Sequence, residues 1–149
     1  MLDLAGNGVG TRSIDDGTRF DLFGTGQSVN TGWTAPDDGF LVLDRNSNGA
    51  VDSGSEMFGI GTQLASGQRA ANGYQALAEL DSNGDKVLNA ADTAFSKLMV
   101  WVDGNGDATS QAGELHSLAD LGITQLDLNA QASDVIDNGN HIGLVSSYT

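Results

Sequence analysis

Acidic and carboxamide side chains recur at every second position in three stretches of this chain, which begin at Asp44, Asp81 and Asp103. A calcium ion takes six to eight oxygen ligands. The twelve-residue calcium loop supplies them from side chains at positions 1, 3, 5, 9 and 12 and from the main-chain carbonyl at position 7. The sequence therefore predicts two to three Ca²⁺ ions, each bound by one of these loops.

The stretches 81–92 and 103–114 match every side-chain position of that loop. The first closes on the shorter acid, Asp92, and the second on Glu114, the usual bidentate ligand. Lys86 and Ala108 stand at position 6, where glycine normally makes the sharp turn, so we expect backbone strain at both. The predicted ligands are Asp81, Asn83, Asp85, the Val87 carbonyl, Asn89 and Asp92, and Asp103, Asn105, Asp107, the Thr109 carbonyl, Gln111 and Glu114.

The stretch that begins at Asp44 matches positions 1 to 9 and keeps Gly49 at position 6. Its position 12 is Ser55, and the acid Glu56 follows one residue late. We expect Glu56 to close this loop, because a shift of one residue is tolerable if the next element starts later. The predicted ligands of this loop are Asp44, Asn46, Asn48, the Ala50 carbonyl, Asp52 and Glu56.

The elements that must position these loops are short. Residues 93–102 alone separate two of the loops, which is too few for two helices and excludes paired EF-hands of the usual kind. Each loop is instead expected to lead into one helix. Periodicity predicts helices over 73–80, 90–98 and 114–121, strands over 40–43, 99–102 and 123–128, and a hairpin over 11–22.

These elements predict an α+β fold, with short helices and a small antiparallel sheet around EF-hand-like loop–helix calcium sites. The length of 149 residues fits a single domain, 1–149. Within it, residues 1–35 form a Gly/Asp-rich β-hairpin region and residues 36–149 a calcium-loop region. Trp33 and Trp101 are expected in the core, whereas His116 and His141 stand alone and are expected at the surface.

The composition limits the possible partners. Twenty Asp and Glu against six Lys and Arg give a formal net charge of −14. This charge argues against nucleic acid or anionic lipid as partners and favours a monomer through self-repulsion. The chain has no cysteine, so no disulfide can stabilise it. It also has no apolar run long enough to predict membrane insertion, and no signal peptide is visible.

Longer segments carry a resemblance that extends over almost the whole chain. They are Thr31–Trp33, Asp37–Asp44, Glu56–Gly59, Asn72–Asp85 and Val100–Asp103, with weaker likeness over Ser110–Leu115 and Ser147–Thr149. In these segments the chain resembles the self-processing module of FrpC-type RTX proteins. The resemblance implies export from Gram-negative bacteria by type I secretion, a secreted or cell-surface location, and neighbouring domains of a parent protein as partners.

The same resemblance implies calcium-dependent cleavage of an Asp–Pro bond at the N-terminal edge of the module. This sequence departs from that pattern, because its only proline, Pro36, follows Ala35. No catalytic residue is therefore predicted in this chain. The loops that begin at Asp3 and Asp21 have also lost most ligand positions and are expected to be glycine turns.

Three functions remain open at this point. The first is a calcium-dependent structural and folding module of a large secreted RTX-type protein or adhesin. The second is calcium-induced autocatalytic cleavage, which requires an Asp–Pro bond upstream of Leu2. The third is a dockerin-like recognition module, because the segment 81–98 resembles a dockerin loop–helix repeat.

Overall fold

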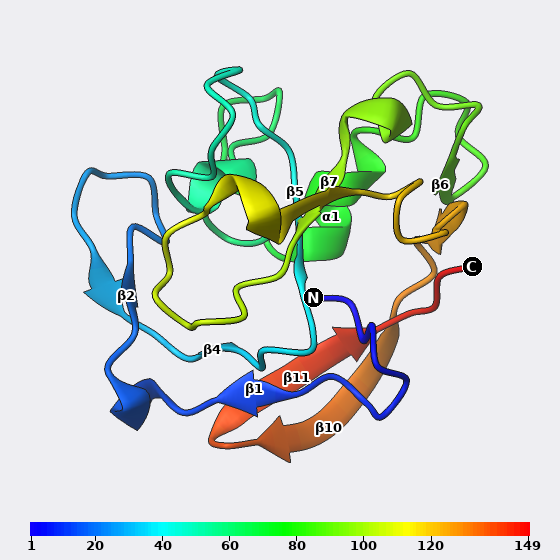
Figure 1. The fold of residues 1–149 in the computed structure, drawn as a ribbon. Coiled ribbons are helices and arrows are strands. Elements are labelled where there is room, and N and C mark those ends of the chain that lie inside the picture. The colour runs from blue at the N-terminus through cyan, green and yellow to red at the C-terminus, as the bar shows by residue number, and fades with distance from the viewer.

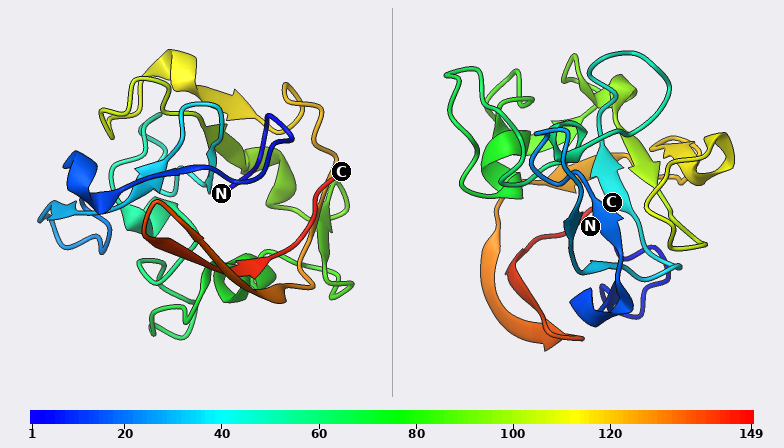
Figure 2. Two further views of the ribbon diagram at one scale, coloured as in Figure 1. Left: turned by 90° about the horizontal axis from the view of Figure 1, so that it is seen from below. Right: turned by 90° about the vertical axis from the view of Figure 1, so that its left-hand side faces the viewer.

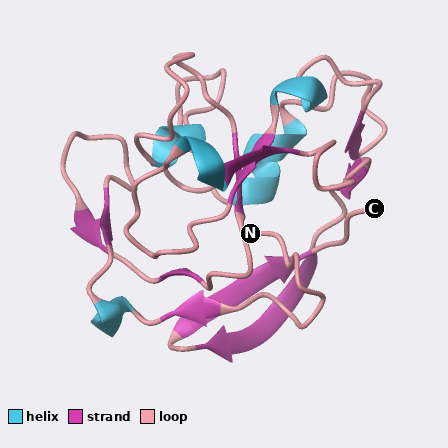
Figure 3. Ribbon diagram, in the orientation of Figure 1, coloured by secondary structure: helices cyan, strands magenta, loops and turns pink.

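The computed structural model describes residues 1–149, most of which form loops between very short strands (Figure 1, Figure 3). The strands are β1 (Thr11–Arg12), β2 (Arg19–Phe20), β3 (Val29–Asn30), β4 (Trp33–Thr34), β5 (Phe40–Val42), β6 (Val87–Asn89), β7 (Met99–Trp101), β8 (Leu115–Ser117), β9 (Gln125–Asp127), β10 (Gln131–Asp137) and β11 (Asn140–Val145). The helical segments are α1 (Gly73–Ala78) and the 3-10 turns η1 (Ile14–Asp16), η2 (Gly54–Glu56), η3 (Phe95–Lys97) and η4 (Ala112–Glu114). All strand pairs are antiparallel.

The α+β prediction is therefore wrong: the fold consists mostly of strands in small antiparallel sheets, with one short α-helix. The expected loop–helix units are absent as well. Within 90–98 only η3 is helical, and most of 114–121 is β8 followed by a turn. Leu115 pairs with Trp101 across β8 and β7, so strand pairing overrides the helical spacing of this segment. The helix predicted over 73–80 is confirmed as α1, which begins after the side-chain cap Asn72.

The expected N-terminal hairpin over 11–22 is also wrong. Its proposed turn is η1, which is capped by Ser13 and ends at Gly17 with a φ of 79°. The two flanking strands do not pair with each other. Instead β1 pairs with β4 and β2 pairs with β3. The antiparallel return of the chain therefore begins at β3 and not directly after η1.

The centre of the molecule is the sheet β5–β7–β8, with Leu41 opposite Val100 and Val100 opposite His116. The strands predicted over 40–43 and 99–102 are confirmed as β5 and β7. Two hydrophobic clusters pack against this sheet. The first cluster contains Leu2, Leu41, Leu88, Leu98, Val100, Leu118, Ile123 and Leu126. The second cluster, called the tryptophan cluster below, contains Phe20, Trp33, Val42, Val51, Met57, Trp101 and Ala108.

Both tryptophans are in the core, as expected: Trp33 is 2% exposed and Trp101 is fully buried. Their ring centroids are 5.4 Å apart in an edge-to-face arrangement, a geometry that aromatic pairs favour. The pair joins β4 to β7, so it connects the N-terminal third of the chain to the central sheet.

The longest sheet is the β10–β11 hairpin, which lies along one outer side of the molecule (Figure 2). It turns at Asn138 and Gly139, whose φ values are 48° and 80°, the conformation that an Asn-Gly hairpin turn requires. It is held to β1 by the Asp137 carboxylate, which accepts from the backbone N–H and the hydroxyl of Thr11 at 2.7 and 2.6 Å. The sequence analysis did not predict this hairpin.

Candidate metal-binding loops

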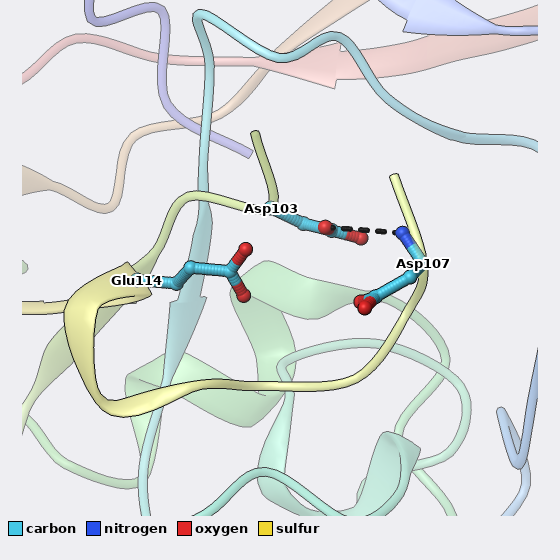
Figure 4. Close-up of side chains that lie close together, drawn as sticks. All are labelled: Asp103, Asp107 and Glu114. Carbon is cyan, nitrogen blue, oxygen red and sulfur yellow. Dashed lines mark hydrogen bonds between the residues drawn. The ribbon is translucent and has the colours of Figure 1, made fainter. Parts of the chain in front are cut away.

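The loop 103–114 brings three carboxylates together. Oxygens of Asp103, Asp107 and Glu114 lie within 4.8 Å of one another (Figure 4). Asp103 is fully buried. Its Oδ1 accepts from the backbone N–H of Gly106 at 2.8 Å, and its Oδ2 accepts from the backbone N–H of Ala108 at 2.9 Å. A buried carboxylate needs such donors, because an unpaired one would carry a large desolvation cost.

The other side chains of this loop converge on the same place. Glu114 accepts the Gln111 backbone N–H at 3.3 Å. The side-chain amides of Asn105 and Gln111 donate to Asp107 Oδ2 at 3.2 and 2.9 Å. The Thr109 backbone N–H and then the Gln111 side chain hold the pKa of Asp107 below its usual range. The residues at positions 1, 3, 5, 9 and 12 are thus linked to one another at one site.

Both tryptophans of the tryptophan cluster contact this site. The indole Nε1–H of Trp33 donates to Asp103 Oδ2 at 2.7 Å, and that of Trp101 donates to Glu114 Oε2 at 3.2 Å. The sequence analysis placed both residues in the core and did not foresee these hydrogen bonds. No spacing in the sequence signals them, because Trp33 is 70 residues from Asp103.

The loop 81–92 is built in a similar way. Asp81 accepts the backbone N–H groups of Gly84 and Lys86, both at 2.8 Å. At the other end of the loop, Asp92 is 4% exposed. It accepts the backbone N–H of Ser82 at 2.8 Å and that of Asn89 at 3.0 Å. The Asn89 N–H is the main cause that lowers the pKa of Asp92.

In the loop that begins at Asp44, the displaced acid Glu56 takes the place that Asp92 holds in its own loop. Glu56 is 3% exposed, and its two oxygens accept the backbone N–H groups of Arg45 at 3.2 Å and Asp52 at 2.8 Å. These are positions 2 and 9 of the loop, the same two positions that donate to Asp92. The turn η2 ends at Glu56 as η4 ends at Glu114, so the extra residue lies before the turn.

All three loops share one backbone conformation, with positive φ at positions 4 and 6. These angles are 59° and 80° at Ser47 and Gly49, 76° and 66° at Gly84 and Lys86, and 70° and 55° at Gly106 and Ala108. The expected departure from normal backbone geometry at Lys86 and Ala108 is therefore present, since residues other than glycine rarely adopt positive φ. This conformation, called the curl below, points main-chain N–H groups at the first aspartate of each loop.

The loops at Asp3 and Asp21 have the same curl. Asp3 accepts the backbone N–H groups of Gly6, Asn7 and Gly8, and Asp21 accepts those of Thr25 and Gly26. The alternating acids are missing here, as the sequence shows. One further buried carboxylate, which the sequence analysis did not single out, is that of Asp38. It is fully buried and accepts the backbone N–H groups of Leu4 and Gly10 at 3.1 and 2.6 Å.

The donor set of the loops fits a hard cation. Every side-chain ligand predicted for them is a carboxylate or a carboxamide, and no cysteine or histidine lies among them. Calcium–oxygen distances are about 2.3–2.6 Å, so oxygens on opposite sides of one ion are about 5 Å apart. The 4.8 Å spread of Asp103, Asp107 and Glu114 is compatible with that geometry.

Fold and loops together define a small loop-rich β domain with a carboxylate cluster that could hold a metal ion. The chain belongs to the SPM domain family, whose family model matches residues 1–149. It is 49% identical over 151 aligned residues to the iron-regulated protein FrpA of Neisseria meningitidis serogroup C. That alignment covers 99% of this chain and 14% of FrpA, so the chain spans only a small part of the length of that relative. No helix here has the length and apolar character needed to cross a membrane.

Proposed function

We propose that this chain is a calcium-dependent folding module of a large secreted RTX-type protein or adhesin. One observation carries the proposal. In the loop 103–114, three carboxylates converge, one of them the fully buried Asp103, while the chain as a whole carries a formal charge of −14. Such a cluster repels itself, and a bound divalent cation removes the repulsion.

The positions of the loops explain why the ion would act on folding. Each loop contributes an apolar residue to a core cluster: Leu88 is fully buried in the first cluster, and Val51 and Ala108 are 4% and 9% exposed in the tryptophan cluster. A loop that repels itself therefore weakens the core directly. An ion present at a hundredfold excess over its dissociation constant adds about 2.7 kcal/mol per site. Two or three sites together supply about 5–8 kcal/mol, which equals the whole stability of many domains.

The proposed setting follows from the family and from the earlier resemblance. The module would stay loosely folded in the calcium-poor cytosol during secretion and would fold outside the cell, where calcium is abundant. Its partners would be calcium and the neighbouring domains of its parent protein.

The test is the thermal midpoint of the purified chain in excess Ca²⁺ and after chelation. We expect cooperative melting with a high midpoint in calcium, and after chelation a lower midpoint with weaker near-ultraviolet signals, the mark of loosened packing. The control is Mg²⁺ at the same concentration, which demands near-ideal octahedral geometry and should restore little structure. Equal midpoints with calcium and with chelator would contradict the proposal.

A second candidate function is cleavage of an Asp–Pro bond directly upstream of residue 1. It is favoured by a cavity of about 550 Å³ that is lined by Met1, Asp3 and Tyr148 among others. The test is a chain extended upstream by Asp–Pro: calcium-dependent release of the extension would support cleavage, and an intact chain after prolonged incubation would exclude it.

A further inference from the structure

The loops at Asp44 and Asp103 touch each other at equivalent positions. The backbone N–H of Val51 donates to the Ser110 hydroxyl at 2.8 Å. Val51 and Ser110 are both position 8 of their loops, directly after the carbonyl that position 7 offers to an ion. The corresponding residue of the third loop, Leu88, pairs instead with Leu126 of β9.

The two loops also share one core. Val51 and Ala108 pack in the tryptophan cluster, which further contains Trp101, two residues before Asp103, and Met57, the residue after Glu56. Leu88 packs in the first hydrophobic cluster. The core therefore divides the three loops into a pair and a single loop. In Figure 1 the single loop, which contains β6, lies on the right.

The two loops close in the same way. The residue before each first aspartate donates its backbone N–H to the carbonyl of the closing glutamate: Leu43 to Glu56 at 2.8 Å, and Val102 to Glu114 at 2.9 Å. In the third loop the equivalent residue, Leu80, donates to Leu77 instead. Loop closure at Glu56 and at Glu114 thus fixes the ends of β5 and β7, which are neighbours in the central sheet.

We propose that the loops at Asp44 and Asp103 bind calcium as one cooperative pair and that the loop at Asp81 binds independently. This inference rests on the proposed calcium binding. An ion in either loop orders position 8 of that loop, and the Val51–Ser110 contact and the tryptophan cluster transmit the order to the other loop. The second ion then meets a loop that is already ordered, so it binds more tightly.

Each loop contains its own reporter for the test. The backbone N–H groups of Gly49, Gly84 and Gly106 donate to the first aspartate of their loops, all at 2.8 Å. In the full ¹⁵N-labelled chain, titrated with Ca²⁺ alone, these three amide signals follow the three loops separately. We expect Gly49 and Gly106 to change together along one steep curve and Gly84 to follow its own curve.

Asp44→Ala removes one member of the pair. We expect the calcium midpoint of Gly106 to rise at least about fivefold, the lower end of typical coupling. The matched control, Asp81→Ala, should shift the Gly106 midpoint less than about twofold. An unchanged midpoint in Asp44→Ala, or equal shifts in the two variants, would overturn the pairing.

Ser110→Ala keeps every predicted ligand and removes only the acceptor of the contact. It should separate the Gly49 and Gly106 curves by about twofold to tenfold, the range that the loss of one hydrogen bond produces. Ser110→Thr, which restores the hydroxyl, should bring the curves back together. If the curves coincide in Ser110→Ala, or if Ser110→Thr separates them equally, the contact does not couple the loops. If none of the three amides responds to Ca²⁺ in the unaltered chain, the proposed function itself fails.

Discussion

The hydrogen bond from the Trp33 indole to Asp103 connects the tryptophan cluster to the first residue of the loop 103–114. Trp33→Phe removes the indole N–H and keeps an aromatic ring in place. The bond is 2.7 Å long, and its acceptor is a fully buried carboxylate. A hydrogen bond to a charged group contributes about 1.5–3 kcal/mol, and the smaller ring adds a packing loss of about 1 kcal/mol. We therefore expect the free energy of unfolding to fall by about 2.5–4 kcal/mol.

The matched control is Trp101→Phe, which makes the same change in the neighbouring ring. Its indole N–H bond is longer, 3.2 Å, and its acceptor, Glu114, is only half-buried. The packing loss is similar in the two variants, because both indoles are buried in the same cluster. The difference between them therefore isolates the hydrogen bond, and we expect Trp33→Phe to cost at least about 1 kcal/mol more.

The assay is urea denaturation of both variants and the unaltered chain in excess calcium, followed by far-ultraviolet circular dichroism. Each transition is fitted with its own baselines, because the replaced indoles contribute to this signal, and the free energy of unfolding is taken from its midpoint and slope. Equal losses in the two variants would refute the reasoning, because the cost would then come from packing alone. A loss below about 1 kcal/mol for Trp33→Phe would refute it as well.

Three further predictions concern single positions in the loops. Glu56→Ala leaves two backbone N–H groups without their acceptor and should lower the free energy of unfolding by about 2 kcal/mol. Ser55→Ala changes the residue that stands at position 12 by sequence and should lower it by less than about 1 kcal/mol. Equal shifts in thermal midpoint would contradict the closing role of Glu56. Lys86→Gly relieves the backbone strain at a φ of 66° and should raise the free energy of unfolding, measured by urea titration, by about 0.5–1 kcal/mol. A decrease would show that the lysine side chain contributes more to stability than the strain costs. Folding lowers the pKa values of Asp92 and Asp107. Their contribution to stability is therefore complete above the unfolded pKa of about 4 and is lost as the pH falls from there through the folded pKa. A decline in thermal midpoint that is already complete by pH 5 would point to other groups.

The sequence revealed the loops better than the elements between them. Alternating acids in the loop 103–114 predicted three carboxylates that converge in the structure, and the late acid Glu56 accepts two backbone N–H groups of its loop. The helices expected after the loops failed for a physical reason. Asp92 and Glu114 turn back to their own loops for backbone N–H groups, and the chain after Glu114 is taken up by β8 beside β7. Local spacing carries no information about such long-range pairing.

The β10–β11 hairpin was missed for a different reason. Its strands have exposed apolar residues, with Ile136 70% and Val135 56% exposed, and a bulge interrupts the register between Ala132 and Val135. The alternation that marks a half-buried strand is therefore weak. The signal that was available is the Asn138-Gly139 pair, which is a strong hairpin turn sequence. Nothing in the sequence pattern indicated that Asp137 would reach Thr11 across 126 residues.

The loops at Asp3 and Asp21 show which part of the sequence determines shape and which part determines ion binding. Both keep an aspartate at position 1 and glycines at positions 4 and 6, and both keep the curl, although Ala5 and Phe23 now stand where the other loops place an amide oxygen. The curl therefore requires only an acceptor and two residues that tolerate positive φ. A cation requires in addition the oxygens at positions 3, 5 and 12. For that reason the convergence of Asp103, Asp107 and Glu114, and not the shape of the loop, is the observation on which calcium binding by this chain depends.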